Sequence, residues 1–229
     1  MKRGWLSMYP WIIPAGLEPL EPIRYAARMA IRWEGLAAMG GGALWVVTYV
    51  GSVLLGRQGE RPDTDVSAAW LPFFAAFCGA SLLLGTSLLG LHARPRSHAR
   101  WTAQAGLLLA TLAVATAGAN LVLLTGAVGP ARFSPDLGGT GVMAVCASTV
   151  LLGLAARKGQ APLPWAGHAL IALGVSTVVL IAASTLSFGS VPAYVVDDLP
   201  FALAGAVWFA LGLAMRARPL PSVDAQTLQ

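Results

Sequence analysis

Two adjacent acidic residues, Asp197 and Asp198, stand where a long apolar segment begins. A pair of carboxylates can bind a cation or act as general acid and base. The same pair also suits the start of a helix, because the positive N-terminal end of the helix dipole stabilises acidic side chains. Both interpretations stay open, and Asp65 and Asp136 would join a catalytic or cation-binding cluster only if their loops converge on the pair.

Three histidines, His92, His98 and His168, fall on one predicted side of a membrane. Zinc sites usually combine several histidine, cysteine or carboxylate ligands, and no carboxylate accompanies these residues. Haem ligation needs two histidines at matched depth on facing helices, and only His168 enters an apolar segment. The sequence therefore predicts no metal and no cofactor. His168 remains a candidate acid–base group, although it starts its helix on the side opposite to the aspartates.

Asn120 is the only carboxamide well inside an apolar segment, and several hydroxyl side chains accompany it. Such groups commonly form hydrogen bonds within or between membrane helices. They would instead line a polar cavity if their helices surrounded one, and the candidates for that role are Asn120, Ser81, Ser148 and Ser176.

The composition indicates that these residues are carried by membrane helices. Hydrophobic residues make up 56% of the 229-residue chain and charged residues only 11%, whereas soluble domains carry about 25% charged residues. A helix needs roughly 17–25 apolar residues to cross a bilayer. We therefore predict an all-α polytopic membrane protein with six transmembrane helices, over residues 37–55, 68–91, 102–126, 140–156, 165–187 and 198–215.

The basic residues assign an orientation to these six segments. Twelve lysines and arginines fall in the termini and loops of one side, and three fall on the other, namely Arg57, Arg61 and Arg132. Because positive residues are retained in the cytosol, both termini are expected to be cytosolic. The alanine-, glycine- and arginine-rich composition is typical of bacteria, so the expected location is the inner (plasma) membrane. The net charge of +5 follows from this partition, and no nucleic-acid partner is predicted.

The N-terminal segment is expected to lie along the membrane surface. On a helix over 17–34, the charged residues fall on one narrow arc and apolar residues on the rest, which is typical of an amphipathic interfacial helix. The segment would serve as a surface anchor or as a docking surface for a partner subunit. The candidate docking residues are Trp5, Trp11, Arg24, Arg28 and Arg32.

A short pattern suggests an internal repeat. Leu-Gly-Leu-x-x-Arg recurs at 89–94, 152–157 and 211–216, each time at the cytosolic end of an even-numbered segment. Leu-Pro-Phe recurs at 71–73 and 199–201, where two segments begin. Three tandem helical hairpins would explain the spacing. Chance would also explain it, because leucine and glycine are abundant and arginine commonly ends a helix on the cytosolic side.

These observations divide the chain into an N-terminal interfacial segment (1–36), a six-helix bundle (37–215) and a cytosolic tail (216–229). Without an evident catalytic constellation, the sequence favours an accessory or scaffold subunit that contacts lipid and other membrane subunits or copies of itself. The first alternative is a small transporter or channel with a cavity between the three hairpins. The second is an enzyme acting on a lipid or isoprenoid, with Asp197, Asp198 and His168 as its acid–base groups.

Overall fold

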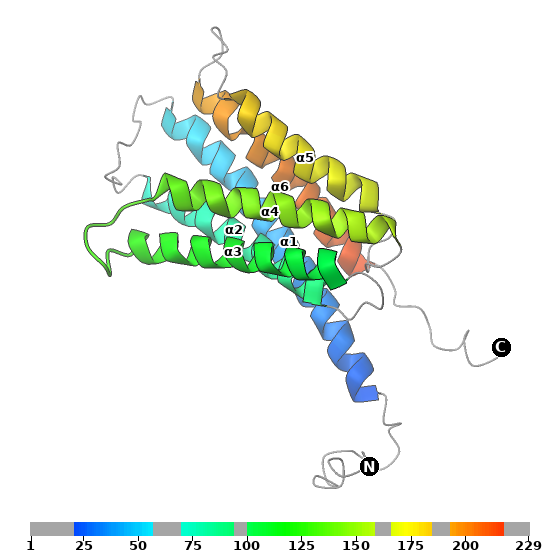
Figure 1. Ribbon diagram of the computed structural model, residues 1–229. Helices are drawn as coiled ribbons and strands as arrows, with labels where there is room; N and C mark the ends of the chain where they lie inside the picture. Colours follow the sequence, from blue (N-terminus) through cyan, green and yellow to red (C-terminus); the bar gives the residue numbers. More distant parts are fainter. Residues whose placement is uncertain (1–20, 57–69, 94–99, 159–165, 185–192, 218–229) are drawn as a thin grey trace, which may run out of the picture.

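The computed structural model describes residues 21–56, 70–93, 100–158, 166–184 and 193–217, with side chains from residue 33 in the first helix and from 198 in the last. These residues form six helices (Figure 1). They are α1 (Glu21–Gly56), α2 (Leu71–Ala93), α3 (Arg100–Leu124), α4 (Pro135–Arg157), α5 (Gly167–Ser184) and α6 (Ala193–Ala217).

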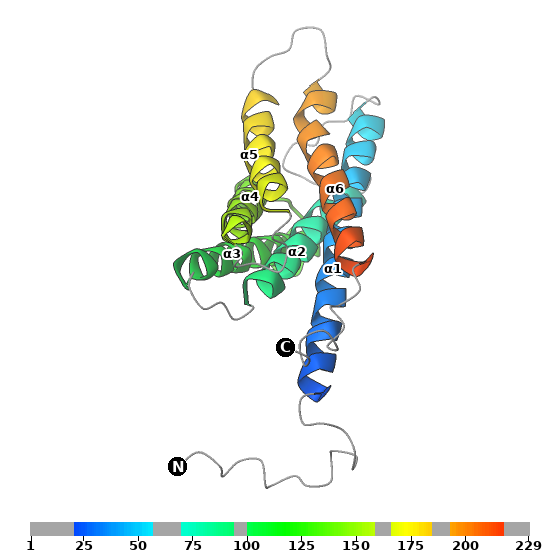
Figure 2. The same ribbon diagram turned by 90° about the vertical axis from the view of Figure 1, so that its right-hand side faces the viewer.

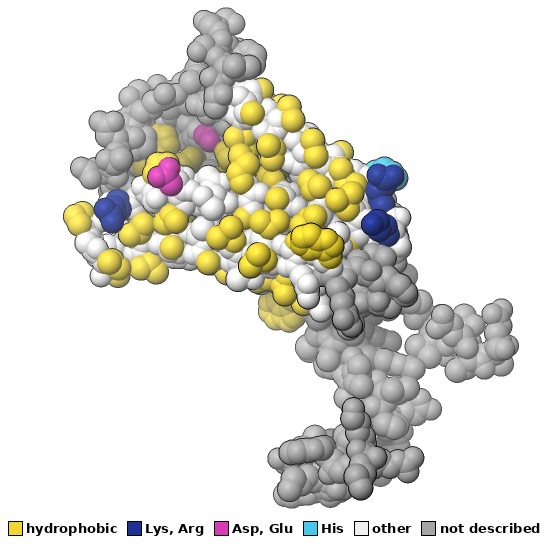
Figure 3. Space-filling model, viewed as in Figure 1, with side chains coloured by type: hydrophobic (Ala, Val, Ile, Leu, Met, Phe, Trp, Pro, Cys, Tyr) yellow, Lys and Arg dark blue, Asp and Glu magenta, His cyan; other side chains and the backbone are white. Residues whose placement is uncertain are grey.

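The prediction of an all-α protein with six membrane-spanning helices is confirmed. Each of the six helices is long and apolar enough to cross a membrane. Large apolar side chains stand on the outside of the bundle, for example Leu108, which is 71% exposed, and Val179, which is 58% exposed. Figure 3 shows such side chains spread over α3, α4 and α5. A surface of this kind suits hydrocarbon as its solvent, so the chain is a multi-pass membrane protein.

The first helix differs from the predicted pair of an interfacial helix and a separate span. No break divides the two parts, and α1 runs without interruption over 36 residues. At about 1.5 Å per residue this helix is about 54 Å long, against about 30 Å for the hydrocarbon core. Figure 1 shows its N-terminal part extending beyond the other helices. The candidate residues Arg24, Arg28 and Arg32 belong to this part, although their side chains, like Trp5 and Trp11, lie outside the described residues.

The fourth helix begins five residues earlier than predicted, at Pro135 instead of residue 140. Ser134 is its N-cap, and the Ser134 hydroxyl accepts a hydrogen bond from the Leu137 amide. Proline suits the first helical turn, where its missing N–H costs no hydrogen bond. Asp136 follows in the same turn, where the helix dipole stabilises a negative charge. The start signal therefore consists of polar residues, which a search for apolar segments passes over.

Consecutive helices pack against each other, and α1 makes its most extensive contact with α6. Figure 2 shows α1 and α6 side by side, with α3 and α4 on the other side of α2. The contact between α5 and α6 is limited. We call the two ends of the bundle the Asp198 end and the Arg157 end, after one residue at each. Helices α2, α4 and α6 begin at the Asp198 end and finish at the Arg157 end.

Glycines set the close approach of α1 and α6. A Cβ atom at Gly42 would lie 2.4 Å from the Gly205 carbonyl oxygen, and one at Gly205 would lie 2.5 Å from the Gly42 oxygen. Seven residues along each helix, Gly35 and Gly212 face each other in the same way. In lipid, where no hydrophobic force drives helices together, small residues permit the close backbone packing that stabilises the pair.

Two of the three copies of the Leu-Gly-Leu-x-x-Arg pattern make similar helix contacts through their glycines. Gly153 and Gly212 are the glycines of its second and third copies, and each faces a glycine of a neighbouring helix, Gly167 and Gly35 respectively. Gly90 of the first copy instead faces the Glu34 side chain. The contacts at the second and third copies are alike and those at the first are not, so duplication stays a prediction.

Candidate ligand pocket

A pocket of about 240 Å³ opens at the Asp198 end, between α2, α4, α5 and α6. Its walls therefore come from all three predicted hairpins. Figure 3 shows a hollow between α4 and α5 near this end, with an acidic side chain visible in it. The described residues that line the pocket are apolar apart from one carboxylate, and they are Phe73, Phe74, Phe77, Phe133, Pro135, Gly138, Gly139, Val142, Met143, Ile181, Asp198 and Phe201.

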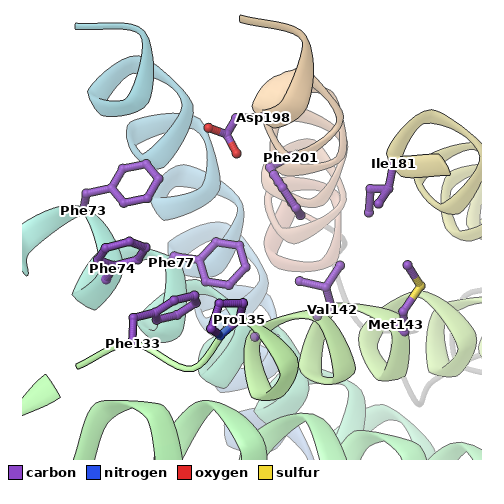
Figure 4. A pocket seen from close by; sticks show the side chains of 12 residues that line it. Phe73, Phe74, Phe77, Phe133, Pro135, Val142, Met143, Ile181, Asp198 and Phe201 are labelled. Carbon is purple, nitrogen blue, oxygen red and sulfur yellow. The ribbon is translucent and has the colours of Figure 1, made fainter. Parts of the chain in front are cut away.

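Five phenylalanine rings form one side of the pocket (Figure 4). Phe77 connects two others, because its ring lies edge-to-face with Phe201 at 5.4 Å and with Phe133 at 5.9 Å between centroids. Phe133 in turn stacks on Phe74 at 4.3 Å, and Phe74 lies edge-to-face with Phe73 at 5.1 Å. These are favourable aromatic geometries, which hold the rings together as one wall.

Helical periodicity explains how the sequence brings these rings together. Phe73 and Phe77 are four residues apart on α2, and Phe74 is three residues before Phe77, so all three lie toward one face. Asp198 and Phe201 are likewise three residues apart on α6. An aromatic face of α2 and the turn of α6 that carries Asp198 and Phe201 thus both line the pocket.

Asp198 is the charged residue among the described residues that line the pocket. It is half-buried, and the Ser52 hydroxyl of α1 donates a hydrogen bond to its carboxylate. Helix α6 begins at Ala193, so Asp198 lies inside the helix and does not cap it, contrary to the helix-start interpretation. Figure 4 shows its carboxyl group at the edge of the pocket, on the side of Phe73. The side chain of Asp197 lies outside the described residues.

The structure separates Asp198 from the other candidate catalytic residue. His168 is exposed in the first turn of α5, at the Arg157 end. Within the described part of the chain, no group of three His, Cys, Asp or Glu residues is placed to hold a metal ion. Asp198 and His168 therefore cannot act on one substrate at one site.

A buried polar cluster at the Arg157 end lies outside the sequence-based expectations. His92 is 3% exposed, and its Nε2 atom donates to the Ser148 carbonyl oxygen of α4 at 3.1 Å. The Ser148 hydroxyl donates to the Gly106 carbonyl oxygen of α3 at 3.0 Å. A Cβ atom at Gly106 would lie 2.1 Å from His92 Cε1, so glycine makes room for the ring. These contacts join α2, α3 and α4.

Glu34 is buried at the same end, 7% exposed, between α1 and α2. The Ser87 hydroxyl of α2 donates to the Glu34 carbonyl oxygen at 3.0 Å. A Cβ atom at Gly90 would lie 2.6 Å from Glu34 Oε1, which again shows a polar side chain packed over a glycine. The predicted first span begins at residue 37, which predicts an interfacial position for Glu34; the structure instead buries its side chain.

The four residues predicted to line a cavity lie elsewhere than in this pocket. Asn120 is fully buried, and its side chain forms two hydrogen bonds with the Ser134 backbone, to the carbonyl oxygen at 3.1 Å and from the amide at 3.0 Å. Ser81 and Ser176 bond to carbonyl oxygens of their own helices. Ser148 belongs to the His92 cluster. All four therefore form internal hydrogen bonds at their places in the fold.

The pocket can bind a small molecule chemically, because it combines an apolar wall with one polar group that would orient a ligand. Comparison of the chain with protein-family models, with curated proteins and with solved structures finds no match.

Proposed function

We propose that this membrane protein binds a small apolar or amphiphilic molecule in the pocket at the Asp198 end. The observation that supports this most directly is the pocket itself, with about 240 Å³ of space bordered by aromatic rings and a carboxylate. Ligand sites are typically concave and mostly apolar, with few polar groups that fix orientation. Binding of this kind is the first step of transport, so the pocket favours the small-transporter alternative over a purely structural role.

The proposal places the pocket toward the outside of a bacterial inner membrane. Arg157 and Arg216 are exposed at one end of the bundle, while Asp136 and Asp198 lie at the other. Cytosolic loops are enriched in lysine and arginine, which supports a cytosolic Arg157 end with both chain termini on that side. A ligand would then reach the pocket from the periplasmic side or from the outer leaflet.

A role as an accessory subunit is the second candidate function, and the first helix favours it. The N-terminal part of α1 extends beyond the other helices (Figure 1). The sequence of this part is amphipathic, so it offers a partner a charged face and an apolar face. The two functions are compatible, because a ligand-binding subunit can also dock on a partner through a separate element.

Placing a large side chain at the pocket is expected to weaken ligand binding strongly. Gly139 lines the pocket, and a Cβ atom built there has no heavy atom within 4 Å. Gly139 is also exposed, so Gly139→Phe should add a ring at the mouth of the pocket without a clash. We expect this variant to bind two probes, benzyltrimethylammonium and neopentylbenzene, about tenfold or more weakly than the original chain, because the space is taken. Equilibrium dialysis of protein in lipid nanodiscs against empty nanodiscs measures both affinities.

Gly118→Phe is the matched control. Gly118 lies on α3 away from the pocket, and a Cβ atom there also has no heavy atom within 4 Å. The control makes the same chemical change in a membrane helix and should leave both affinities unchanged. Equal binding by Gly139→Phe and the original chain would contradict the proposed function.

A further inference from the structure

We infer that the pocket selects a small organic cation, an ammonium group carrying one apolar arm. The inference rests on the proposed function and adds the chemical class of the ligand to it. The charged group would lie between Asp198 and the rings of Phe73, Phe77 and Phe201, and the arm would extend toward α4 and α5.

The charge of the pocket favours a cationic ligand. Among the twelve described residues that line the pocket, Asp198 is the only one with an ionisable side chain. Lysine, arginine and histidine do not occur among these described residues, so the pocket wall offers a cation a carboxylate and offers an anion no opposite charge. Between apolar walls the effective dielectric constant is lower than in water, which strengthens attraction of a cation to a carboxylate. The bond from Ser52 holds the carboxylate in place at the edge of the pocket.

The aromatic wall of the pocket also favours a cation. Phenylalanine rings are negative on their faces, and a cation within about 6 Å of a ring centroid is attracted to that face. Several rings gathered around one space act together on quaternary ammonium groups, which are weakly hydrated and easily transferred from water. Aliphatic side chains would enclose a neutral ligand equally well, so five phenylalanines beside one carboxylate favour a cation.

The size and shape of the pocket suit a ligand with a small head group and one apolar arm. A cavity of about 150 Å³ can hold benzene, and the present pocket of about 240 Å³ has room for a ring and a small head group. Figure 4 shows Val142, Met143 and Ile181 on the side away from Phe73. One side of the pocket is therefore aromatic and acidic, and the other is aliphatic. This asymmetry matches a ligand with a charged head and an apolar arm.

The test compares two probes of nearly equal shape. Benzyltrimethylammonium carries a positive charge, and neopentylbenzene has a carbon atom in place of the nitrogen. Both affinities are measured by nanodisc dialysis, after subtraction of binding to empty nanodiscs. We expect the cation to bind about tenfold or more tightly than the neutral probe, since the carboxylate and the ring faces act on the charge alone.

Asp198→Asn should remove this preference. Asparagine keeps the shape of the side chain and an oxygen that accepts the bond from Ser52, so only the charge is lost. Retained binding of neopentylbenzene shows that the variant is folded. Phe77→Leu should also weaken binding of the cation more than that of the neutral probe. Asp136→Asn is the control, since Asp136 is exposed at the same end and does not line the pocket.

The outcomes separate the two proposals. Preference for the cation that disappears in Asp198→Asn and persists in Asp136→Asn supports the inference. Equal affinity for the two probes, each lost in Gly139→Phe, overturns the selection of cations and leaves a ligand pocket. Binding of neither probe above empty nanodiscs overturns the proposed function and the inference together.

Discussion

Replacing Gly42 with valine is expected to disrupt the bundle severely, by forcing α1 away from α6. A Cβ atom at this position would lie 2.4 Å from the Gly205 carbonyl oxygen and 2.6 Å from the Phe209 nitrogen. Both are backbone atoms, so no side-chain rotation relieves the contact and the helices must separate. Overpacking typically costs about 1–3 kcal/mol, and we expect a loss near or above about 3 kcal/mol because this is the most extensive helix contact.

The control for this prediction is a glycine substitution that should cause no loss of stability. At Gly118 a Cβ atom meets no heavy atom within 4 Å, so Gly118→Ala should be neutral or stabilise α3 by about 0.5–1 kcal/mol through helix propensity. Unfolding in mixed micelles with increasing SDS, followed by tryptophan fluorescence, compares the two variants. Equal stability of Gly42→Val and the original chain would mean that α1 and α6 do not cross at this glycine.

Replacing Asn120 with leucine is expected to loosen the connection between α3 and α4. The fully buried amide bonds to both backbone groups of Ser134, the residue that caps α4. Leucine would leave these groups without their side-chain partner, at a cost of about 1–3 kcal/mol. Phe133 precedes the cap and stacks on Phe74, so the aromatic wall of the pocket should be disturbed as well.

Hydrogen exchange at the Ser134 amide measures this effect directly, because this N–H donates a hydrogen bond to the Asn120 side-chain oxygen. Protection should fall in Asn120→Leu. Asn120→Asp keeps an acceptor for the Ser134 amide and loses the donor to the Ser134 carbonyl oxygen, so its protection should be intermediate. Unchanged exchange in Asn120→Leu would show that other contacts hold the start of α4.

The six helices could be predicted because length and apolarity suffice to define membrane spans. The first and last residues of each helix are harder to predict, since helices continue beyond the hydrocarbon core through polar residues. The α1 helix includes Glu34, α2 includes His92, and α6 begins before Asp198. The sequence therefore predicts interfaces or helix starts at these polar residues, whereas the structure buries the first two and places the third inside a helix.

The pocket could not be predicted, because a phenylalanine in an apolar span gives no sign of what it faces. Only the fold brings together Phe77 of α2, Phe133 just before α4 and Phe201 of α6, through contacts between their rings. One signal was present in the sequence, since the recurring Leu-Pro-Phe tripeptide contains two of the pocket residues, Phe73 and Phe201. In the sequence this tripeptide suggests duplication, and only the structure shows that both phenylalanines line one pocket.

An outward-facing pocket that attracts cations can be tested most directly through the reactivity of a cysteine at position 139. In a background with Cys78→Ala and Cys146→Ala, Gly139→Cys places a single thiol at the pocket wall. We expect membrane-impermeant thiosulfonate reagents added outside the cell to modify it, and a cationic reagent to react about tenfold faster than an anionic one, since Asp198 concentrates positive charge in the pocket. Asp198→Asn should remove the difference. A thiol that reacts only from the cytosolic side, or equally fast with both reagents, would contradict the proposed orientation or the proposed selectivity.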